Sequence, residues 1–353
     1  MKRQLAWFFA LFMLLSGCTD TAGQPVEKVE GNLQVHYLDV GQADAALVCC
    51  EGQYMLIDGG NAEDSDQIYA YLDRLGVEEL VCMVATHAHE DHVGGLSGAL
   101  NRVSVDMALC PVTENDTKVF ENMVHYLDQQ GKTLTVPEPG DTFSLGDAQV
   151  EILGPVAEYD QANNTSIVLR IDYGTTSFLF TGDMEETAEE DLIAAGSDLS
   201  ATVLKVGHHG SDTSTSLDFL DQVQPEYAVI SVGEDNSYGH PSQTVLSRLE
   251  EAQVQVFRTD LQGTVVAMSD GESVTFQTQR TLPIQEEKGE TQETPDTAQS
   301  YVGNTNSKKF HLPDCTSVEE MKVDNQMLFS TREEAIQAGY TPCQRCNPRR
   351  RKR

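Results

Sequence analysis

The chain has 353 residues, of which 39% are hydrophobic and 22% charged, a composition typical of a soluble globular protein with room for about two domains. No apolar run after the N-terminal residues approaches the ~20 residues that a membrane-spanning helix needs, which excludes a multi-pass membrane protein. With 23 Lys and Arg against 56 Asp and Glu, the net charge of -33 argues against a basic surface that wraps nucleic acid regardless of its sequence.

The chain begins with the pattern of an export signal. Lys2 and Arg3 precede an apolar run over residues 5–15, and Leu-Ser-Gly at 15–17 stands directly before Cys18. A Cys after Leu-Ser-Gly resembles the signals of bacterial lipoproteins, whose processing enzymes lipidate that Cys and expose it as the new N-terminus. An ordinary secretory signal with an incidental Cys is the alternative.

The lipoprotein resemblance implies that residues 1–18 are a signal peptide, that Cys18 carries a lipid anchor and that residues 19–32 are a polar tether. The expected location is therefore extracytoplasmic, with the protein bound to the membrane through its lipid. Cys49, Cys50, Cys82 and Cys110 lie in apolar, strand-like runs, where buried thiols are favoured over disulfides, although the sequence leaves both open.

Residues 33–280 alternate strand and helix patterns and are expected to form mixed sheets covered by helices on the outside. Three strands that open the region have the order of a β-meander. Strands are predicted at 33–40, 45–50, 54–57, 80–85, 149–153, 166–172, 177–180, 203–206, 227–232 and 254–257. Helices are predicted at 66–75, ending at Gly76, and at 118–130, 186–195 and 243–252.

The densest group of metal-ligand residues follows the strand predicted at 80–85. Residues 86–92 read Thr-His-Ala-His-Glu-Asp-His and place three imidazoles and one carboxylate within six residues. A packed core would have to supply a partner for every one of these polar atoms, and metal ions are such partners. His87 and His89 alternate onto one side of an extended segment to bind one ion, while Asp91 and His92 at the next helix start turn toward a second.

The motif at 86–92 resembles the metallo-β-lactamase superfamily, and the similarity extends over nearly all of residues 33–280. The fold implied is an α/β (α+β) sandwich with αββα layers, two mixed sheets and the metal site at one sheet edge. In this family Asp58 supports the metal-binding loop, Asp183 bridges both ions and His208 is the last ligand of the second ion. Taken alone, Asp58 and Asp183 could equally be turn residues.

Other positions come with that resemblance. His209 orients the loop or exchanges roles with His208. Ser211 and His240 are expected near the phosphate or the leaving oxygen, although His240 could instead be an exposed residue at a helix start. Asn163 and Asn164 stand where many relatives have a third histidine for the first ion; His125, in a predicted helix, is the only histidine between His92 and Asp183.

Finer motifs resemble the hydrolase domain of ComEC-type competence proteins. They lie at 38–45 (LDVGQADA), 163–166 (NNTS), 205–211 (KVGHHGS) and 238–242 (YGHPS). The channel of that family is absent from this sequence, so it looks like the hydrolase part exported alone. Ala43 departs from the pattern, since relatives typically have Gly at that position.

The last fifty residues differ in charge from the rest. From Tyr301 onward there are 10 basic and 6 acidic residues, a net charge of +4, against 13 and 50, a net charge of -37, before it. Residues 281–300 are rich in Gln, Glu, Thr and Pro and predict a flexible linker. The basic tail at 349–353 could contact DNA phosphates or anionic polymers of the cell surface, or could simply be solvated.

Residues 301–353 contain a set of zinc ligands. His311, Cys315, Cys343 and Cys346 have the spacing of a closed Cys3His site, and a unit this small needs a structural metal because burial alone cannot stabilise it. The segment resembles the metal-binding domain of the DNA-repair protein Ada, with His311 in place of one Cys. A disulfide between Cys343 and Cys346 is the alternative.

These patterns predict an extracytoplasmic, two-metal phosphodiester hydrolase of the ComEC-like nuclease class. The cofactors expected are two divalent ions, Zn or Mn, in the hydrolase site and one structural Zn in the C-terminal module. DNA or another phosphodiester polymer is the expected substrate, the membrane is contacted through the lipid anchor, and no protein partner can be inferred. The alternatives are a phosphodiesterase for small substrates or cell-wall polymers, of the phosphocholine-esterase kind, and a non-catalytic surface module that binds DNA.

Overall fold

The computed structural model describes residues 32–281, 301–312, 315–319, 321–322, 325–329 and 332–343. These residues form two compact units, the first within 32–281 and the second from 301 onward. Within these ranges no helix has both the length and the apolar character that crossing a bilayer requires. The predicted signal peptide, Cys18, the tether before Asn32 and the linker after Thr281 lie outside the described residues.

The first sheet of the larger unit has mixed strand directions. Its central strands follow the predicted meander, because β1, β2 and β3 pair antiparallel, whereas β3, β4, β5 and β6 pair parallel. In sheet order the strands are β15 (Val274–Thr278), β14 (Val265–Ser269), β1 (Leu33–Tyr37), β2 (Ala46–Cys50), β3 (Gln53–Ile57), β4 (Glu79–Val84), β5 (Ser104–Leu109) and β6 (Leu134–Thr135).

The second sheet is also mixed. Strands β7 to β10 pair antiparallel, and β10 to β13 pair parallel. In sheet order the strands are β13 (Gln255–Arg258), β12 (Tyr227–Ile230), β11 (Val203–Lys205), β10 (Thr176–Phe180), β9 (Val168–Tyr173), β8 (Ala148–Gly154) and β7 (Thr142–Leu145). This arrangement brings the carboxyl ends of β10, β11 and β12 to one edge.

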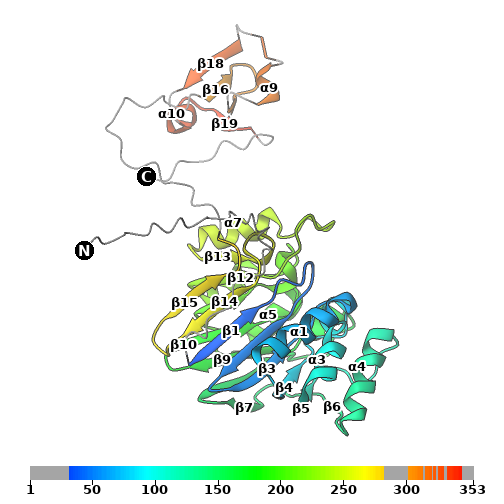
Figure 1. Ribbon diagram of the computed structural model, residues 1–353. Helices are drawn as coiled ribbons and strands as arrows, with labels where there is room; N and C mark the ends of the chain where they lie inside the picture. Colours follow the sequence, from blue (N-terminus) through cyan, green and yellow to red (C-terminus); the bar gives the residue numbers. More distant parts are fainter. Residues whose placement is uncertain are drawn as a thin grey trace, which may run out of the picture. The chain divides into compact units, whose positions relative to one another are not determined.

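The core lies in three layers, one between the sheets and one under each set of helices. Alternation along the strands produces them, since Val48 and Phe178 face the space between the sheets while Leu47 and Leu179 face the helices. Figure 1 shows α1, α3 and α4 beside the strands of the first sheet. The helices over the first sheet are α1 (Ser65–Leu75), α2 (Glu90–Val93), α3 (Leu96–Arg102) and α4 (Lys118–Gln129), those over the second are α5 (Glu186–Ala195), α6 (Leu217–Val223) and α7 (Gln243–Glu251), and α8 (Thr259–Gln262) follows β13.

The αββα fold predicted for residues 33–280 is confirmed, and every predicted strand and helix of this region is present. Helix α1 ends as predicted at Gly76, whose φ of 68° is left-handed and whose N–H donates to the Leu72 carbonyl. Strand β1 stops at Tyr37, three residues earlier than predicted, and β9 starts later because a 3-10 turn occupies Ala162–Thr165. Unpredicted helices and strands are α3, α6, α8, β5, β6, β7, β14 and β15.

The second unit is built around a small sheet. Its strands in sheet order are β18 (Gln326–Phe329), β16 (Tyr301–Asn304), β17 (Lys309–His311) and β19 (Thr341–Pro342), with helices α9 (Thr316–Glu319) and α10 (Arg332–Gln337). Tyr301, Phe310, Phe329, Ala335 and Tyr340 form its apolar cluster. A core of this size is small, as expected for a module that depends on a metal.

The packing of α1 against α3 gives a stability prediction. A Cβ on Gly98 would lie 2.0 Å from the Ser65 carbonyl oxygen, so the helices would have to separate. Gly98→Ala should therefore lower the free energy of unfolding by about 1–3 kcal/mol in urea denaturation, despite the better helix propensity of Ala. Asn101→Ala, at an exposed position of the same helix, should change it by less than about 0.5 kcal/mol. Equal effects of the two substitutions would contradict the packing argument.

Candidate metal centre

The candidate site lies where the carboxyl ends of parallel strands from both sheets meet. The segments that follow β3 and β4 in the first sheet face those that follow β10 and β11 in the second. Asp58 follows β3, residues 86–92 follow β4, Asp183 follows β10 and residues 207–211 follow β11. The sequence order of the motifs therefore becomes a spatial cluster at one edge of the sandwich.

Asp58 holds the loop at 86–92 in place through contacts of its carboxylate. One carboxylate oxygen accepts from the Thr86 backbone N–H and the other from the Thr86 hydroxyl, each at 2.7 Å. The second oxygen also lies 2.8 Å from Nδ1 of His92, which fixes this ring with Nε2 turned toward the site. Asp58 has a left-handed φ of 58°, so it is placed by a turn as well as by its hydrogen bonds. These contacts agree with the supporting role that the resemblance implies.

His87 and His89 form the first group of ligand candidates. Nε2 of His87 lies 2.9 Å from Nδ1 of His89, and the first ring is buried while the second is exposed. Ser166 stands behind His87, with its hydroxyl 3.4 Å from Nδ1 of the ring, and accepts a hydrogen bond from the Asp183 N–H at 3.0 Å. The two imidazoles thus lie close together on the bend that follows β4, and their role as ligands of one ion stays a prediction.

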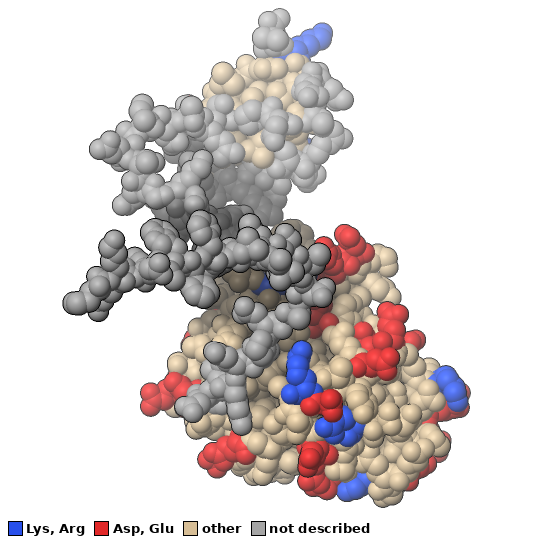
Figure 2. All heavy atoms as spheres, viewed as in Figure 1, with Lys and Arg blue, Asp and Glu red and all other residues tan. Residues whose placement is uncertain are grey.

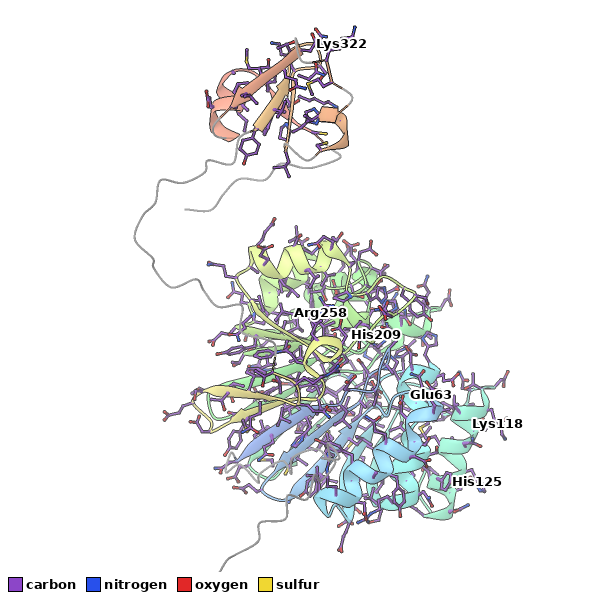
Figure 3. All side chains as sticks on the ribbon, turned by 45° about the horizontal axis from the view of Figure 1, so that its top comes forward. Glu63, Lys118, His125, His209, Arg258 and Lys322 are labelled. Atoms are coloured by element: carbon purple, nitrogen blue, oxygen red, sulfur yellow. The ribbon has the colours of Figure 1, made fainter. Side chains whose placement is uncertain are left out.

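Asp91, His92, Asp183 and His209 form the second group. One ligand atom from each lies within 4.8 Å of all the others. Nε2 of His209 is 3.3 Å from Asp91 Oδ2 and 3.7 Å from Asp183 Oδ2. Figure 3 places His209 in this part of the unit and His125 away from it on α4, where the His125 ring contacts Gln129.

The second group fits a divalent cation. Nε2 of His92 and Oδ1 of Asp183 are 3.3 Å apart and buried, yet neither has a hydrogen-bond partner. Burial opposes ionisation of Asp183, but His92 and His209 hold the pKa of its carboxyl well below the usual range. Two nitrogens and two carboxylates in this arrangement suit Zn or Mn, because a cation satisfies the buried polar atoms that the protein leaves unpaired.

The geometry favours His209 over His208 for the second group, which is the exchange of roles that the sequence left open. Both residues have left-handed backbones, with φ of 50° and 53°, so their side chains diverge. Nδ1 of His209 lies 3.3 Å from the Asp44 carboxylate. Burial opposes protonation of His209, but the Asp183 and Asp44 carboxylates raise its pKa to about 10 in the metal-free protein.

His208 lies beside the same oxygen of Asp183 but has other neighbours. Its Nε2 is 3.8 Å from Asp183 Oδ2, and its Nδ1 is 3.5 Å from Glu185 Oε1 and 3.2 Å from the Thr213 hydroxyl. Asn163 donates to the same Glu185 oxygen at 3.2 Å and lies 3.5 Å from Nε2 of His208. Glu185 was not singled out in the sequence, although it follows the Thr-Gly-Asp motif by only two residues.

The remaining predicted residues surround this cluster. Asn164 accepts a hydrogen bond from the Glu185 N–H at 2.9 Å and therefore supports the loop. The Ser211 side chain is buried and contacts the Thr213 hydroxyl at 3.0 Å. That hydroxyl in turn lies 3.2 Å from Nδ1 of His208. The half-buried His240 ring lies edge-on to His208, with the ring centroids 5.7 Å apart. The catalytic roles of Ser211 and His240 stay predictions.

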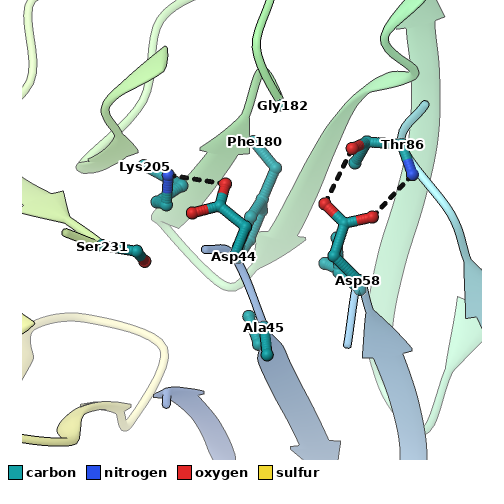
Figure 4. Close-up of a pocket in the computed structure, with 10 residues that line it drawn as sticks. Asp44, Ala45, Asp58, Thr86, Phe180, Gly182, Lys205 and Ser231 are labelled. Atoms are coloured by element: carbon teal, nitrogen blue, oxygen red, sulfur yellow. Dashed lines mark hydrogen bonds and ion pairs between the residues drawn. The ribbon is translucent and has the colours of Figure 1, made fainter. Parts of the chain in front are cut away.

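A buried ion pair below the site was not predicted. Lys205 Nζ lies 2.8 Å from Asp44 Oδ2, and both side chains are almost completely buried. Asp44, Asp58, Thr86, Lys205 and Ser231 line a cavity of about 10 Å³, which is near the lower limit for one ordered water (Figure 4). Asp44 also contacts the ring of His209, a ligand candidate. The ion pair therefore connects Lys205, on β11 of the second sheet, to that ring.

The second unit contains three of its four predicted zinc ligands within the described residues. His311, Cys315 and Cys343 are buried, with their ligand atoms within 4.8 Å of one another. Nδ1 of His311 is 3.5 Å from the Cys315 sulfur. Cys346 and the basic tail lie outside the described residues.

No disulfide joins two of the described cysteines. In the first unit, burial raises the pKa of the Cys110 thiol to about 12.

Comparisons with known proteins cover both units. Residues 38–234 match the family described as Metallo-beta-lactamase superfamily, and residues 291–349 match Metal binding domain of Ada.

ComE operon protein 3 of Bacillus subtilis (strain 168) is 31% identical over 251 residues, 66% of this chain and 32% of that protein. Competence protein ComA of Neisseria gonorrhoeae is 31% identical over 257 residues, 71% and 34% of the two chains. Recombination protein 2 of Haemophilus influenzae is 32% identical over 238 residues, which cover 66% of this chain and 28% of that protein. The chain spans about a third of the length of these curated relatives.

The buried ion pair gives a second stability prediction. Lys205→Met removes the nearer of the two cationic groups that face the buried Asp44 carboxylate, so the free energy of unfolding of the metal-free protein should fall by about 3–5 kcal/mol. Adding Asp44→Asn removes the buried carboxylate that has lost this partner and should restore at least ~1 kcal/mol. Urea denaturation of the two single variants and the double variant measures the coupling. Strict additivity would show that the pair does not act as a unit.

Proposed function

This chain belongs to the metallo-beta-lactamase superfamily of metal-dependent hydrolases, and from that premise we propose that it cleaves phosphodiesters, with DNA as its substrate. The observation that carries the proposal is the position of Asp183. Its Oδ1 lies 3.3 Å from His92, while its Oδ2 lies 3.7 Å from His209, 3.8 Å from His208 and 4.0 Å from His87. One carboxylate therefore reaches both groups of ligand candidates, as a residue shared by two ions must.

The residues divide between two ions in this proposal. His87, His89 and Asp183 would hold the first, and Asp91, His92, His209 and Asp183 would hold the second. When bound, such ions supply a water of lowered pKa and neutralise charge on the phosphate. In this proposal His209 takes the ligand role in exchange with His208, and His208 lies beside Asp183 with its ring oriented by Glu185.

Hydrolysis forms a bond from the water oxygen to phosphorus and breaks the bond from phosphorus to the leaving oxygen, which then needs a proton. The proposed donor is His240, because its ring stands beside His208 at the open side of the cluster. Ser211, whose hydroxyl bonds to Thr213, would act by holding the loop that carries His208. Asp58, Asn163 and Asn164 position the ligand loops without contacting the substrate.

The choice of DNA is supported by two of the relatives, whose names refer to competence and to recombination. The charge of the first unit acts against it, because acidic side chains are spread over the face that Figure 2 shows, with only a few basic groups between them. This charge favours a short or small phosphodiester as the second candidate, which needs no basic groove. The proposal also has the protein act outside the cytoplasm, attached to the membrane by a lipid at Cys18. This location is inferred from the sequence pattern of residues 2–18 alone.

The proposal predicts the effect of removing one ligand. Asp91→Ala should abolish cleavage of single-stranded DNA and of bis-p-nitrophenyl phosphate by the Mn-loaded or Zn-loaded protein, because it removes a carboxylate from the second group. The melting temperature of the metal-free protein should stay close to the original, since Asp91 is only partly buried. Asp128→Ala, at an exposed position of α4, is the matched control and should keep full activity. Full activity of Asp91→Ala would disprove the ligand assignment.

The basic C-terminal region gives a separate prediction. Deleting residues 301–353 removes a net charge of +4, and with it the part of the chain best suited to contact phosphates. DNA binding should weaken at low salt and approach that of the full chain at high salt, as measured by fluorescence anisotropy between about 50 and 200 mM salt. Identical salt dependence of the two proteins would remove this role from the C-terminal module.

A further inference from the structure

The loop between β12 and α7 carries an exposed aromatic ring beside the metal centre. Tyr238 is 72% exposed, which makes it the most exposed large apolar or aromatic side chain among the described residues. The neighbouring large side chains on the same loop and strand, such as Val232, are buried. A ring this exposed contributes little burial energy to the fold, so its surface is available for contact with a ligand.

The Tyr238 ring continues a row of rings that starts at the site. Its centroid lies 5.7 Å from that of His240, with the two planes 25° apart, so the rings are stacked. The His240 ring in turn lies 5.7 Å from His208, which is 3.8 Å from Asp183. The His240 ring thus lies alongside Tyr238, and the 72% exposure of Tyr238 leaves most of its ring open to solvent.

The loop that holds Tyr238 is closed by its own hydrogen bonds. Oδ1 of Asn236 accepts from the backbone N–H of Tyr238 at 3.2 Å and of His240 at 3.0 Å. Nδ2 of Asn236 donates to the carbonyls of Gly233 at 3.0 Å and His240 at 2.6 Å. The ring is therefore presented by a constrained turn, and binding to it costs little further ordering.

The loop that carries Tyr238 is also hydrogen-bonded to the loop of Gln42 and to the loop of His208 and His209. Gln42 accepts a hydrogen bond from the Gly233 N–H at 3.1 Å, and its amide nitrogen lies 3.5 Å from Nδ1 of His240. At the other end, the Ser242 N–H donates to the Gly210 carbonyl at 2.8 Å, next to His208 and His209. The loop that carries His208 and His209 is thus directly hydrogen-bonded to the loop that presents Tyr238.

We propose that Tyr238 is a stacking platform for an unpaired nucleobase adjacent to the phosphodiester that is cleaved, which makes single-stranded nucleic acid the preferred substrate. The inference rests on the proposed phosphodiesterase function and deepens it. Bases stack on aromatic side chains regardless of their identity, because every base has a π-face. Stacking also needs no basic groove, and so it provides affinity on a unit whose acidic charge disfavours phosphate contacts.

A quaternary ammonium group, as in a choline ester, is the other ligand that an aromatic ring recognises. Sites for such a group are lined by several aromatic rings in a cage. Near Tyr238 the described rings are the imidazoles of His240 and His208, and the loop presents one open aromatic face. A single open face is sufficient for stacking, so the observations favour the nucleobase.

The test compares two oligonucleotides with the same backbone, one with bases and one with abasic sites at every position, using the full Mn-loaded chain. Tyr238→Ala should raise the KM for the base-containing strand roughly 5- to 150-fold, the range expected from stacking energies. The preference for that strand over the abasic strand, as a ratio of kcat/KM, should fall toward one. Tyr238→Phe keeps the ring and should stay within about twofold of the original.

The control is Tyr69→Ala, which removes another exposed tyrosine, on α1, and should leave the ratio unchanged. The platform is overturned if Tyr238→Ala lowers cleavage of the two strands equally, if Tyr238→Phe is as defective as Tyr238→Ala, or if Tyr238→Ala impairs only p-nitrophenyl phosphorylcholine cleavage. If the unaltered chain cleaves neither strand, the DNA proposal fails together with the platform. If the unaltered chain cleaves the base-containing strand and Tyr238→Ala does so equally well, only the platform fails.

Discussion

A buried carboxylate with three hydrogen-bonding contacts, that of Asp58, is the constraint on which the candidate site depends. It accepts the N–H and the hydroxyl of Thr86 and contacts Nδ1 of His92, so the loop after β4 has one arrangement. Burial raises the pKa of Asp58, which makes these contacts necessary to compensate the buried group. With the loop fixed, His92 presents Nε2 to Asp183, and the other ligand candidates assemble around that carboxylate.

The local part of the site could be predicted from the sequence because its residues are close together in the chain. The motif at 86–92 is dense, and Asp58, Asp183 and His209 each follow a strand whose end lies at the same edge. The choice between His208 and His209 could not be predicted, since both have left-handed backbones in which neither helical nor strand periodicity tells where a side chain points. Asp44 and Lys205 were missed as a pair because they are far apart in sequence and belong to different sheets.

The same distinction between local and distant information applies to the fold. Strands with clear alternation and helices with an end signal, such as α1 with Gly76, were predicted. Helix α3 was missed because it has only seven residues and includes Gly98, which weakens the helical pattern but is required for the contact with α1. Strands β14 and β15 complete the first sheet beside β1, the first strand within the described residues, and no local signal indicates a pairing over such a sequence distance.

The origin of the ligand candidates in two different sheets has a consequence for how the domain holds together. His87, His89, Asp91 and His92 belong to the first sheet, whereas Asp183, His208 and His209 belong to the second. An ion shared between these groups would cross-link the halves of the sandwich, in the way that a disulfide joins two segments, but a chelator could remove it. The cooperativity of unfolding would then depend on the occupancy of the site, so the supply of metal would set the rigidity of the domain as well as its chemistry.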